Sequence, residues 1–237
     1  MSMPIGSLER VCDDFDYGFC KDRLRALFRD TPKLPTMHIT ILTFQGFNEL
    51  DSFIALGLLN RIKKPDWKVT ICCPEPMVTS MNGVTVHAQS RLADARTADA
   101  VIVGSGIKTR EVVNDAALMA ELQLDPSRQL IAAQCSGTLV LAKLGILGAV
   151  PACTDLTTKP WVLEAGVEVL NQPFFAKGNV ATAGGCFASP YLAAWIIART
   201  EGEEAARQAL HYVAPVGEKD EYVALAMKNI APYLPAS

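Results

Sequence analysis

Histidine is scarce in this sequence, and its placement argues against a metal centre. The 237 residues include only three histidines, His38, His87 and His211, which are widely separated. Zinc sites use cysteine and histidine ligands at short, regular spacings, and no such spacing occurs here. We therefore expect no bound metal.

Long apolar runs and basic clusters are missing as well. The apolar stretches are interrupted before the roughly 20 residues that a membrane span needs, and the amino terminus lacks the charged-then-apolar order of a secretory signal. The net charge is −3 and the lysines and arginines are scattered, whereas nucleic-acid binding requires a basic patch. These absences predict a cytoplasmic protein with neither membrane nor nucleic acid among its partners.

The cysteines do not form a disulfide framework. They number seven, at irregular spacings, in a chain whose 50% hydrophobic composition suffices for one well-buried domain. Free thiols in a reducing compartment are therefore expected. The cysteines are Cys12, Cys20, Cys72, Cys73, Cys135, Cys153 and Cys186.

Two parts are predicted along the chain. Residues 1–36 hold an amphipathic stretch followed by two prolines, which predicts an N-terminal helical extension and linker. The alternative is that translation begins near Met37 and that this segment is not part of the natural protein. Residues 37–237 are predicted to form one α/β domain.

Apolar strands alternate with helical periodicity in that domain, as in βαβ units. Strands are predicted at residues 38–44, 67–73, 98–103, 130–133, 152–154, 167–170 and 180–182, and helices at 50–62, 110–122, 138–147, 190–199, 203–213 and 221–230. Asn82-Gly83, between two β-rich arms, predicts a hairpin. Because wholly apolar strands belong in a parallel sheet covered on both faces, we expect a three-layer α/β sandwich with a mainly parallel central sheet.

Cys135 holds a position where a cysteine can react. In "QLIAAQCSGTLVLAKLGIL" it follows a predicted strand and precedes a predicted helix, and the residues two positions away, Ala133 and Gly137, are small, as a sharp nucleophile elbow requires. Backbone N–H groups at the start of the helix would lower the pKa of the thiol. The alternative is that Cys135 is inert core filler.

A nucleophile of this kind needs groups that stabilise an oxyanion. Gly104, Ser105 and Gly106 in "VIVGSGIK" follow a strand and form a turn whose backbone can approach a ligand, and the backbone N–H of Ser136 offers a second donor. On its own such a turn is only a tight connection, and it lacks the third glycine of a dinucleotide-binding fingerprint.

A proton-handling partner is also needed, and "TFQGFNELDSF" offers Glu49 and Asp51 at the end of the first strand. A carboxylic acid with a raised pKa could hydrogen-bond to the cysteine and relay a proton. The alternative is that either residue only caps the helix that begins near Leu50.

Together these segments resemble the ThiJ/PfpI superfamily, a class I glutamine amidotransferase-like group, and in pattern its isocyanide hydratase and AraC-sensor branch. The resemblance spans about residues 37–200 and rests on "LTFQGFNELD", "SMNGVTV", "DAVIVGSG", "AAQCSGTLVLAKLGIL" and "GNVATAGGCFAS" in that order. It implies a flavodoxin-like sandwich, a homodimer and no cofactor for the usual chemistry of the family.

Position by position, the resemblance assigns the reactive cysteine to Cys135, its hydroxyl-bearing neighbour to Ser136 and the glycine turn to Gly104–Gly106. Asp51 corresponds to the acidic residue of the hydratase pattern, and Glu49 corresponds to that of the deglycase and peptidase pattern. The peptidases carry histidine where Ser136 stands. Many members also carry a histidine where Asp155 stands, which puts several known activities in doubt.

Two functions follow as expectations. The first is a cysteine-dependent small-molecule enzyme, of hydratase, hydrolase or glyoxalase type, in which Cys135 attacks an electrophilic carbon and Asp51 or Glu49 relays the proton. The second is a redox or ligand sensor that uses the same cysteine without turnover. Asp155 and Cys186 are candidate auxiliary residues for either function.

Overall fold

The structure of the protein is a computed structural model that describes residues 37–235. The predicted helical extension, residues 1–36, lies outside the described residues. The described residues belong to one compact unit. No helix within residues 37–235 is both long and apolar enough to cross a membrane.

A seven-stranded sheet forms the centre of the fold, in the order β5-β2-β1-β6-β7-β9-β8. Its strands are β1 (Met37–Leu42), β2 (Trp67–Cys73), β5 (Ser90–Arg91), β6 (Ala100–Val103), β7 (Leu130–Gln134), β8 (Phe174–Lys177) and β9 (Val180–Ala183). Neighbouring strands are parallel except for β8, which pairs antiparallel with β9. A separate hairpin of β3 (Met77–Thr79) and β4 (Thr85–His87) encloses the predicted Asn82-Gly83 turn.

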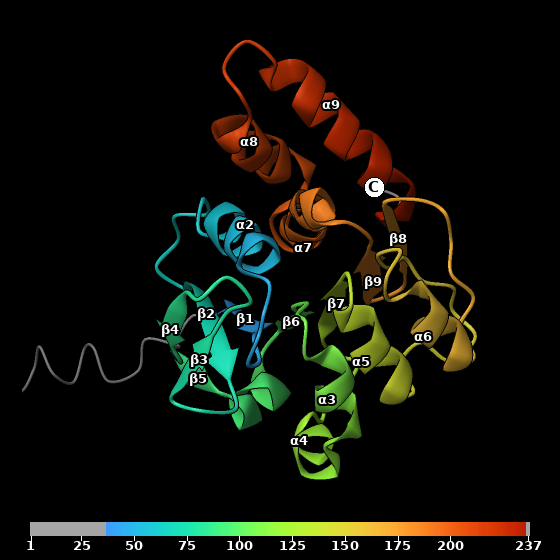
Figure 1. The fold of residues 1–237 in the computed structure, drawn as a ribbon. Helices are drawn as coiled ribbons and strands as arrows, with labels where there is room; N and C mark the ends of the chain where they lie inside the picture. The colour runs from blue at the N-terminus through green and yellow to red at the C-terminus, as the bar shows by residue number, and fades with distance from the viewer. Residues whose placement is uncertain (1–36, 236–237) are drawn as a thin grey trace, which may run out of the picture. The chain divides into compact units, whose positions relative to one another are not determined.

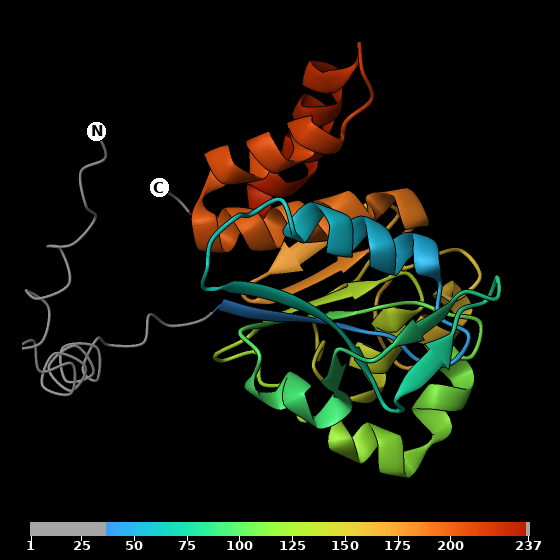
Figure 2. The ribbon, with the colours of Figure 1, turned by 90° about the vertical axis from the view of Figure 1, so that its left-hand side faces the viewer.

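Helices cover both faces of this sheet (Figures 1 and 2). One face carries α2 (Glu49–Leu59) and α7 (Ser189–Glu201), with α8 (Glu203–Val213) and α9 (Lys219–Ile230) packed outside them. The other carries η1 (Leu92–Thr97), α3 (Thr109–Asn114), α4 (Ala116–Glu121), α5 (Gly137–Lys143) and α6 (Lys159–Glu164). The predicted three-layer, flavodoxin-like fold is therefore confirmed.

Alternation along the strands divides the core in two, because successive side chains of a strand point to opposite faces. Ile41 belongs to the cluster that includes Trp195 of α7, whereas the next residue, Leu42, belongs to the cluster that includes Leu139 of α5. Strands buried on both faces explain the continuous apolar runs in the sequence.

Some predicted elements differ from the structure. The predicted helix 110–122 is broken into α3 and α4 at Asp115, whose side chain accepts hydrogen bonds from the amides of Ala117 and Leu118 and so caps a new helix. The predicted helix 138–147 ends as α5 at Lys143, shortly before Gly145, which has a φ of +72°.

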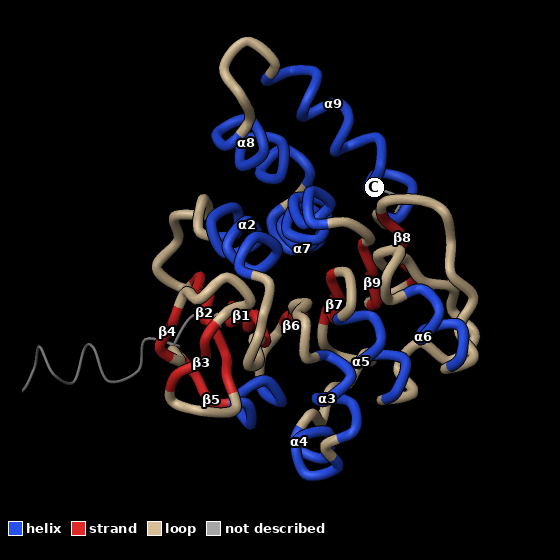
Figure 3. Tube along the Cα trace, in the orientation of Figure 1, coloured by secondary structure: helices blue, strands red, loops and turns tan. Residues whose placement is uncertain are grey.

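The region between α5 and β9 departs most from prediction, and Figure 3 shows how much of it is loop. The predicted strands 152–154 and 167–170 form only an isolated bridge between Ala152 and Val169. Strand β8 was not predicted, although Gly178, with a φ of +60°, forms the turn that joins it to β9.

The strand order also fixes where chemistry is expected. The chain leaves β1 toward β2 and β5 on one side, then returns to β6 and β7 on the other side of β1. In such sheets the carboxyl ends of the strands beside this reversal form the binding crevice. Residues that follow β1, β6 and β7 therefore meet at one edge of the sheet.

Candidate functional site

Cys135 lies at a strained bend between β7 and α5. Its φ is +47°, the only positive value for a non-glycine residue within residues 37–235. Such a backbone conformation costs about 1–3 kcal/mol and persists where the surroundings enforce it. Here the Cys135 amide donates to the carbonyl of Ala183 at 2.8 Å, and the hydroxyl of Thr154 donates to the Cys135 carbonyl at 2.8 Å. Local geometry thus agrees with a nucleophile elbow.

Gly137 permits the close packing of this elbow. A Cβ atom at this position would lie 2.3 Å from the carbonyl oxygen of Val103 at the end of β6. Because that oxygen belongs to the backbone of a central strand, it cannot move aside cheaply. The prediction that small residues flank Cys135 for steric reasons therefore has a direct explanation at Gly137.

The variant Gly137→Ala is expected to lower the free energy of unfolding by about 1–3 kcal/mol, through overpacking against Val103. Gly57→Ala is the matched control, because Gly57 is exposed in α2 and a Cβ there meets no atom within 4 Å. Removing a helical glycine should stabilise that variant by roughly 0.5–1 kcal/mol. Equilibrium urea unfolding measures both, and equal effects would contradict this account of the elbow.

Asp51 approaches Cys135 from the first turn of α2. The side chain of Asn48 caps this helix by accepting from the amide of Leu50, which fixes the direction in which Asp51 points. Asp51 is only 1% exposed, and the hydroxyl of Ser105 donates a hydrogen bond to its carboxylate. A carboxylate oxygen of Asp51 and the sulfurs of Cys135 and Cys186 all lie within 4.8 Å of one another.

Burial governs the electrostatics of this group. It raises the pKa of the Asp51 carboxyl, and hydrogen bonds from Ser105, Cys186 and Cys135 oppose that shift only in part. Burial also raises the pKa of the Cys135 thiol, and the neighbouring charge of Asp51 acts in the same direction. The predicted raised carboxyl pKa agrees with the structure, whereas the predicted lowering of the thiol pKa is wrong. With Cys135 only 4% exposed, desolvation outweighs the field of a seven-residue helix.

Glu49, the other acidic candidate, lies outside this group. It is the first residue of α2, and the backbone amide at its own position is the main cause that lowers the pKa of its carboxyl. Hydrogen bonding to Asn82 and Ser80, in the loop of the β3–β4 hairpin, adds to the effect. Its carboxylate is thus ionised at the start of a helix, although one of its oxygens is buried without a hydrogen-bond partner in the described part of the chain.

The glycine turn after β6 offers fewer free donors than its sequence suggests. The Gly104 amide donates to the carbonyl of Leu42, and the Gly106 amide donates to the hydroxyl of Ser136. Within the described residues, the backbone amides of Ser105 and Ser136 donate to no protein acceptor. These two amides therefore keep free N–H groups beside the turn and the elbow, and their predicted role as oxyanion donors stays a prediction.

Two further candidates have structural partners. The hydroxyl of Ser136 lies 2.7 Å from that of Thr109 and ties the elbow to α3. One carboxylate oxygen of Asp155 accepts from the amides of Thr157 and Thr158, each at 2.9 Å, and so orders the turn before α6. Asp155 is close enough to help raise the pKa of Cys135, but its carboxylate is not among the three grouped atoms.

Two residues at the site were missed from the sequence. The side-chain amide of Gln134 lies 3.5 Å from the Cys135 sulfur and also donates to the carbonyl of Gly185. The amide of Asn48 donates to the Cys186 sulfur at 3.2 Å and lies 3.4 Å from a carboxylate oxygen of Asp51. An asparagine shortly before the predicted helix was a signal for Asn48, although the cap was predicted at Glu49 or Asp51, whereas nothing in the sequence indicated the role of Gln134.

Asp51, Cys135 and Cys186 also have the composition of a ligand set for a thiophilic metal ion. Ligand spacing could not show this, because the three residues are far apart in the sequence. Asn48 and Ser105 already donate hydrogen bonds to Cys186 and Asp51, which satisfies these atoms without an ion.

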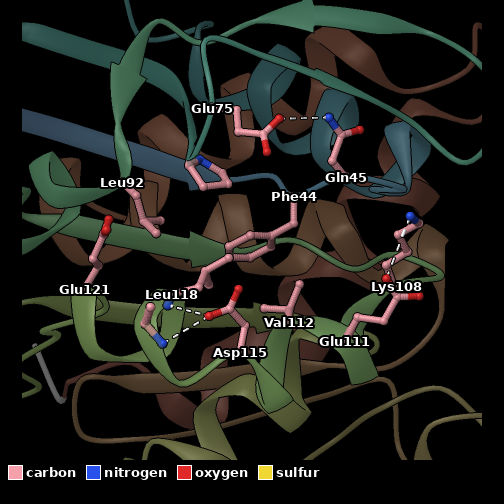
Figure 4. Close-up of a pocket in the computed structure, with 12 residues that line it drawn as sticks. Phe44, Gln45, Glu75, Leu92, Lys108, Glu111, Val112, Asp115, Leu118 and Glu121 are labelled. Atoms are coloured by element: carbon pink, nitrogen blue, oxygen red, sulfur yellow. Dashed lines mark hydrogen bonds and ion pairs between the residues drawn. The ribbon is translucent and has the colours of Figure 1, made fainter.

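A cavity of about 480 Å³ lies elsewhere, between α3, α4 and the ends of β1 and β2. Figure 4 shows its lining, which includes Phe44, Glu75, Leu92, Lys108, Asp115 and Leu118. Several of its polar groups have partners in the protein: Glu75 accepts from Gln45, Asp115 caps α4, and Lys108 pairs with Glu111. No residue of the Cys135 group lines it, and we assign it no role in the chemistry.

Comparison with known proteins identifies the family. The family model described as DJ-1/PfpI matches residues 37–199, which include β1 through most of α7 and thus the whole site. The chain belongs to the DJ-1/PfpI family. The predicted resemblance to ThiJ/PfpI proteins is confirmed, and the elements α8 and α9 lie beyond the matched region. No functionally curated protein matches the sequence.

Several solved structures share the fold at low sequence identity. DJ-1beta of Drosophila melanogaster is 21% identical with a TM-score of 0.66, over 75% of this chain and 97% of that one. A THiJ/PfpI family protein from Pseudomonas syringae is 18% identical with a TM-score of 0.67, over 86% and 92%. An AraC family transcriptional regulator from Pseudomonas putida is 15% identical with a TM-score of 0.61, over 75% and 99%.

Proposed function

We propose that this DJ-1/PfpI protein is a cysteine-dependent enzyme that adds water to small electrophiles, by a hydratase, hydrolase or glyoxalase-like reaction. The observation that supports it most is the grouping of a buried carboxylic acid, Asp51, with a cysteine on a strained elbow, Cys135. Strained backbone and raised pKa values cluster at functional sites, because a purely structural role rarely requires them.

The raised thiol pKa shapes the proposed mechanism, because the resting Cys135 is then a thiol rather than a preformed thiolate. As its sulfur forms a bond to the electrophilic carbon, the thiol proton passes to the Asp51 carboxylate. The free amides of Ser105 and Ser136 stabilise negative charge on the substrate. With an isocyanide, Asp51 passes this proton to the carbon that the sulfur has attacked, which gives a thioimidate. Water then adds to the same carbon, its two protons go to the nitrogen and to the departing sulfur, and the carbon–sulfur bond breaks to restore the thiol. For an isocyanide the product is a formamide.

Burial of the nucleophile bears on the size of the substrate. Cys135 is only 4% exposed, so the site admits compact electrophiles rather than bulky ones.

A substrate panel tests this proposal. The full-length protein is incubated with isocyanides, glyoxals and activated esters, and product formation and protein mass are followed together. Expected is turnover of at least one class, with a transient adduct on the tryptic peptide of residues 129–143, whose one cysteine is Cys135. Adducts spread over all seven cysteines, without turnover, would contradict the proposal.

A homodimer in the cytoplasm is also proposed, as the resemblance to the family implies. Light scattering on the full-length protein would give twice the mass of one chain, and a single-chain mass would contradict the dimer. Small molecules, rather than nucleic acid or membrane, are the proposed partners. The sensor function remains the second candidate because a second thiol, Cys186, lies beside Cys135.

A further inference from the structure

The second thiol at the site is placed there by the fold itself. Gln134 of β7 pairs with Ala183 of β9, so the chain segments that leave these two strands begin side by side. Cys135 follows Gln134 at once, and Cys186 follows Ala183 after a glycine pair. The two sulfurs lie within 4.8 Å of each other. A disulfide requires about 2.05 Å, so one of the side chains must rotate to close the gap.

The glycine pair before Cys186 holds this thiol near Cys135. Gly184 packs so tightly that a Cβ there would lie 2.3 Å from the carbonyl oxygen of Thr154, the residue that also holds the Cys135 carbonyl. Gly185 has a φ of +88° with open space beside it, and its carbonyl accepts from Gln134 at 2.8 Å. The loop is thus anchored to the elbow while its second glycine leaves Cys186 room to turn.

The two thiols differ in access and in hydrogen bonding. Cys135 is 4% exposed, whereas Cys186 is half-buried and is the more accessible sulfur. Burial and the neighbouring Asp51 carboxylate raise the pKa of the Cys186 thiol, and the hydrogen bond that Asn48 donates to its sulfur opposes that shift only in part. A carboxylate oxygen of Asp51 is close enough to accept the thiol proton as the sulfur reacts. A dissolved oxidant therefore meets Cys186 first.

We propose that Cys186 and Cys135 form a reversible disulfide, with Cys186 as the thiol that reacts with hydroperoxides and Cys135 as the thiol that closes the bond. The Cys186 sulfur attacks the hydroperoxide, the oxygen–oxygen bond breaks, and the products are the Cys186 sulfenic acid and an alcohol or water. The Cys135 sulfur then displaces hydroxide from that sulfenic acid. The sulfur–sulfur bond forms and water leaves with the Cys135 proton. A dithiol reductant restores both thiols.

This proposal gives the oxidation a consequence, which rests on the proposed function. In the disulfide Cys135 is no longer a thiol and cannot attack a substrate. Hydroperoxide would therefore inactivate the enzyme, and a reductant would restore its activity. The bond also protects Cys135 from irreversible oxidation to sulfinic acid.

The test measures thiols without any substrate. The full-length protein is treated with hydrogen peroxide, alkylated and digested with trypsin, and the peptides 129–143 and 178–199 are followed by mass spectrometry, because each holds one of the two cysteines alone. Expected is one linked species of these two peptides, which dithiothreitol converts fully back to free thiols. Unlinked peptides with Cys135 oxidised and Cys186 still a free thiol would overturn the proposal.

Two variants assign the order of events. In Cys135→Ser, the sulfenic acid on Cys186 should persist and be trapped by dimedone. In Cys186→Ser, Cys135 should remain reduced at a peroxide dose that fully oxidises the wild type. Rapid oxidation of Cys135 in Cys186→Ser would reverse the assigned roles and refute the proposal. Because no turnover is measured, the peptide map of the wild type remains decisive even if the substrate panel fails or a variant does not fold.

Discussion

Replacing Cys135 with alanine is expected to lower kcat/KM by more than about 10³-fold for every substrate that the site turns over, because the proposed mechanism assigns the bond to carbon to the Cys135 sulfur. The fold should survive, since alanine retains a Cβ and the hydrogen bonds that hold this elbow are made by the backbone of Cys135. Initial rates over a range of substrate concentrations measure the loss, and circular dichroism confirms the fold.

Cys153→Ala is the matched control for this prediction. Cys153 is also a buried cysteine, and burial raises the pKa of its thiol to about 12, but it lies outside the group of Asp51, Cys135 and Cys186. Its removal is expected to cost some stability and to leave kcat/KM within about twofold of the wild type, since its thiol is not grouped with the reacting atoms and only interactions made in the transition state change the rate. Equal activity of Cys135→Ala and Cys153→Ala would end the proposal of nucleophilic catalysis.

The fold and the bend at Cys135 were predictable because both leave strong local patterns. A run such as that of β7 is apolar without interruption only when both faces of a strand are buried, and its change to small residues at Cys135 marks a bend. The prediction missed the edge strand β8. This strand is four residues long and antiparallel, so it shows no βαβ pattern. A predicted helix such as 110–122 has continuous periodicity, and only the capping bond at Asp115 divides it.

The identity of the acid could not be decided from spacing alone. Glu49 and Asp51 are two residues apart in α2, and a helix turns through about 200° over that distance, so only one of them can face Cys135. Asn48 decides which of the two faces Cys135, because its N-cap hydrogen bond fixes the residue at which the helix begins. The thiol pKa was mispredicted for a related reason, since burial is a property of the assembled site and not of the local sequence.

The variant Asp51→Asn is expected to lower the activity and to raise the stability of the protein. Loss of the group that accepts the Cys135 proton is expected to lower kcat by about 10²- to 10⁴-fold. In the wild type, kcat should rise with pH as Asp51 ionises, at a pH above the ordinary range of an aspartate because the pKa of Asp51 is raised by burial. Glu49→Gln is the control, since its carboxylate lies outside the group, and it should retain both the rate and this pH profile.

Stability should follow the same ionisation with the opposite sign. Because the pKa of Asp51 is raised in the folded state, that state holds the proton more tightly than the unfolded chain does, and the free energy of unfolding falls as pH rises from about 4 through the folded pKa. Asp51→Asn lacks this loss. Its melting temperature should exceed that of the wild type by a few degrees at neutral pH and converge with it near pH 4. Thermal unfolding of both proteins between about pH 4 and neutral pH measures this difference. If the variant were less stable than the wild type at every pH, the Asp51 carboxylate would stabilise the fold. That result would contradict the expectation that burial of the carboxylate lowers stability.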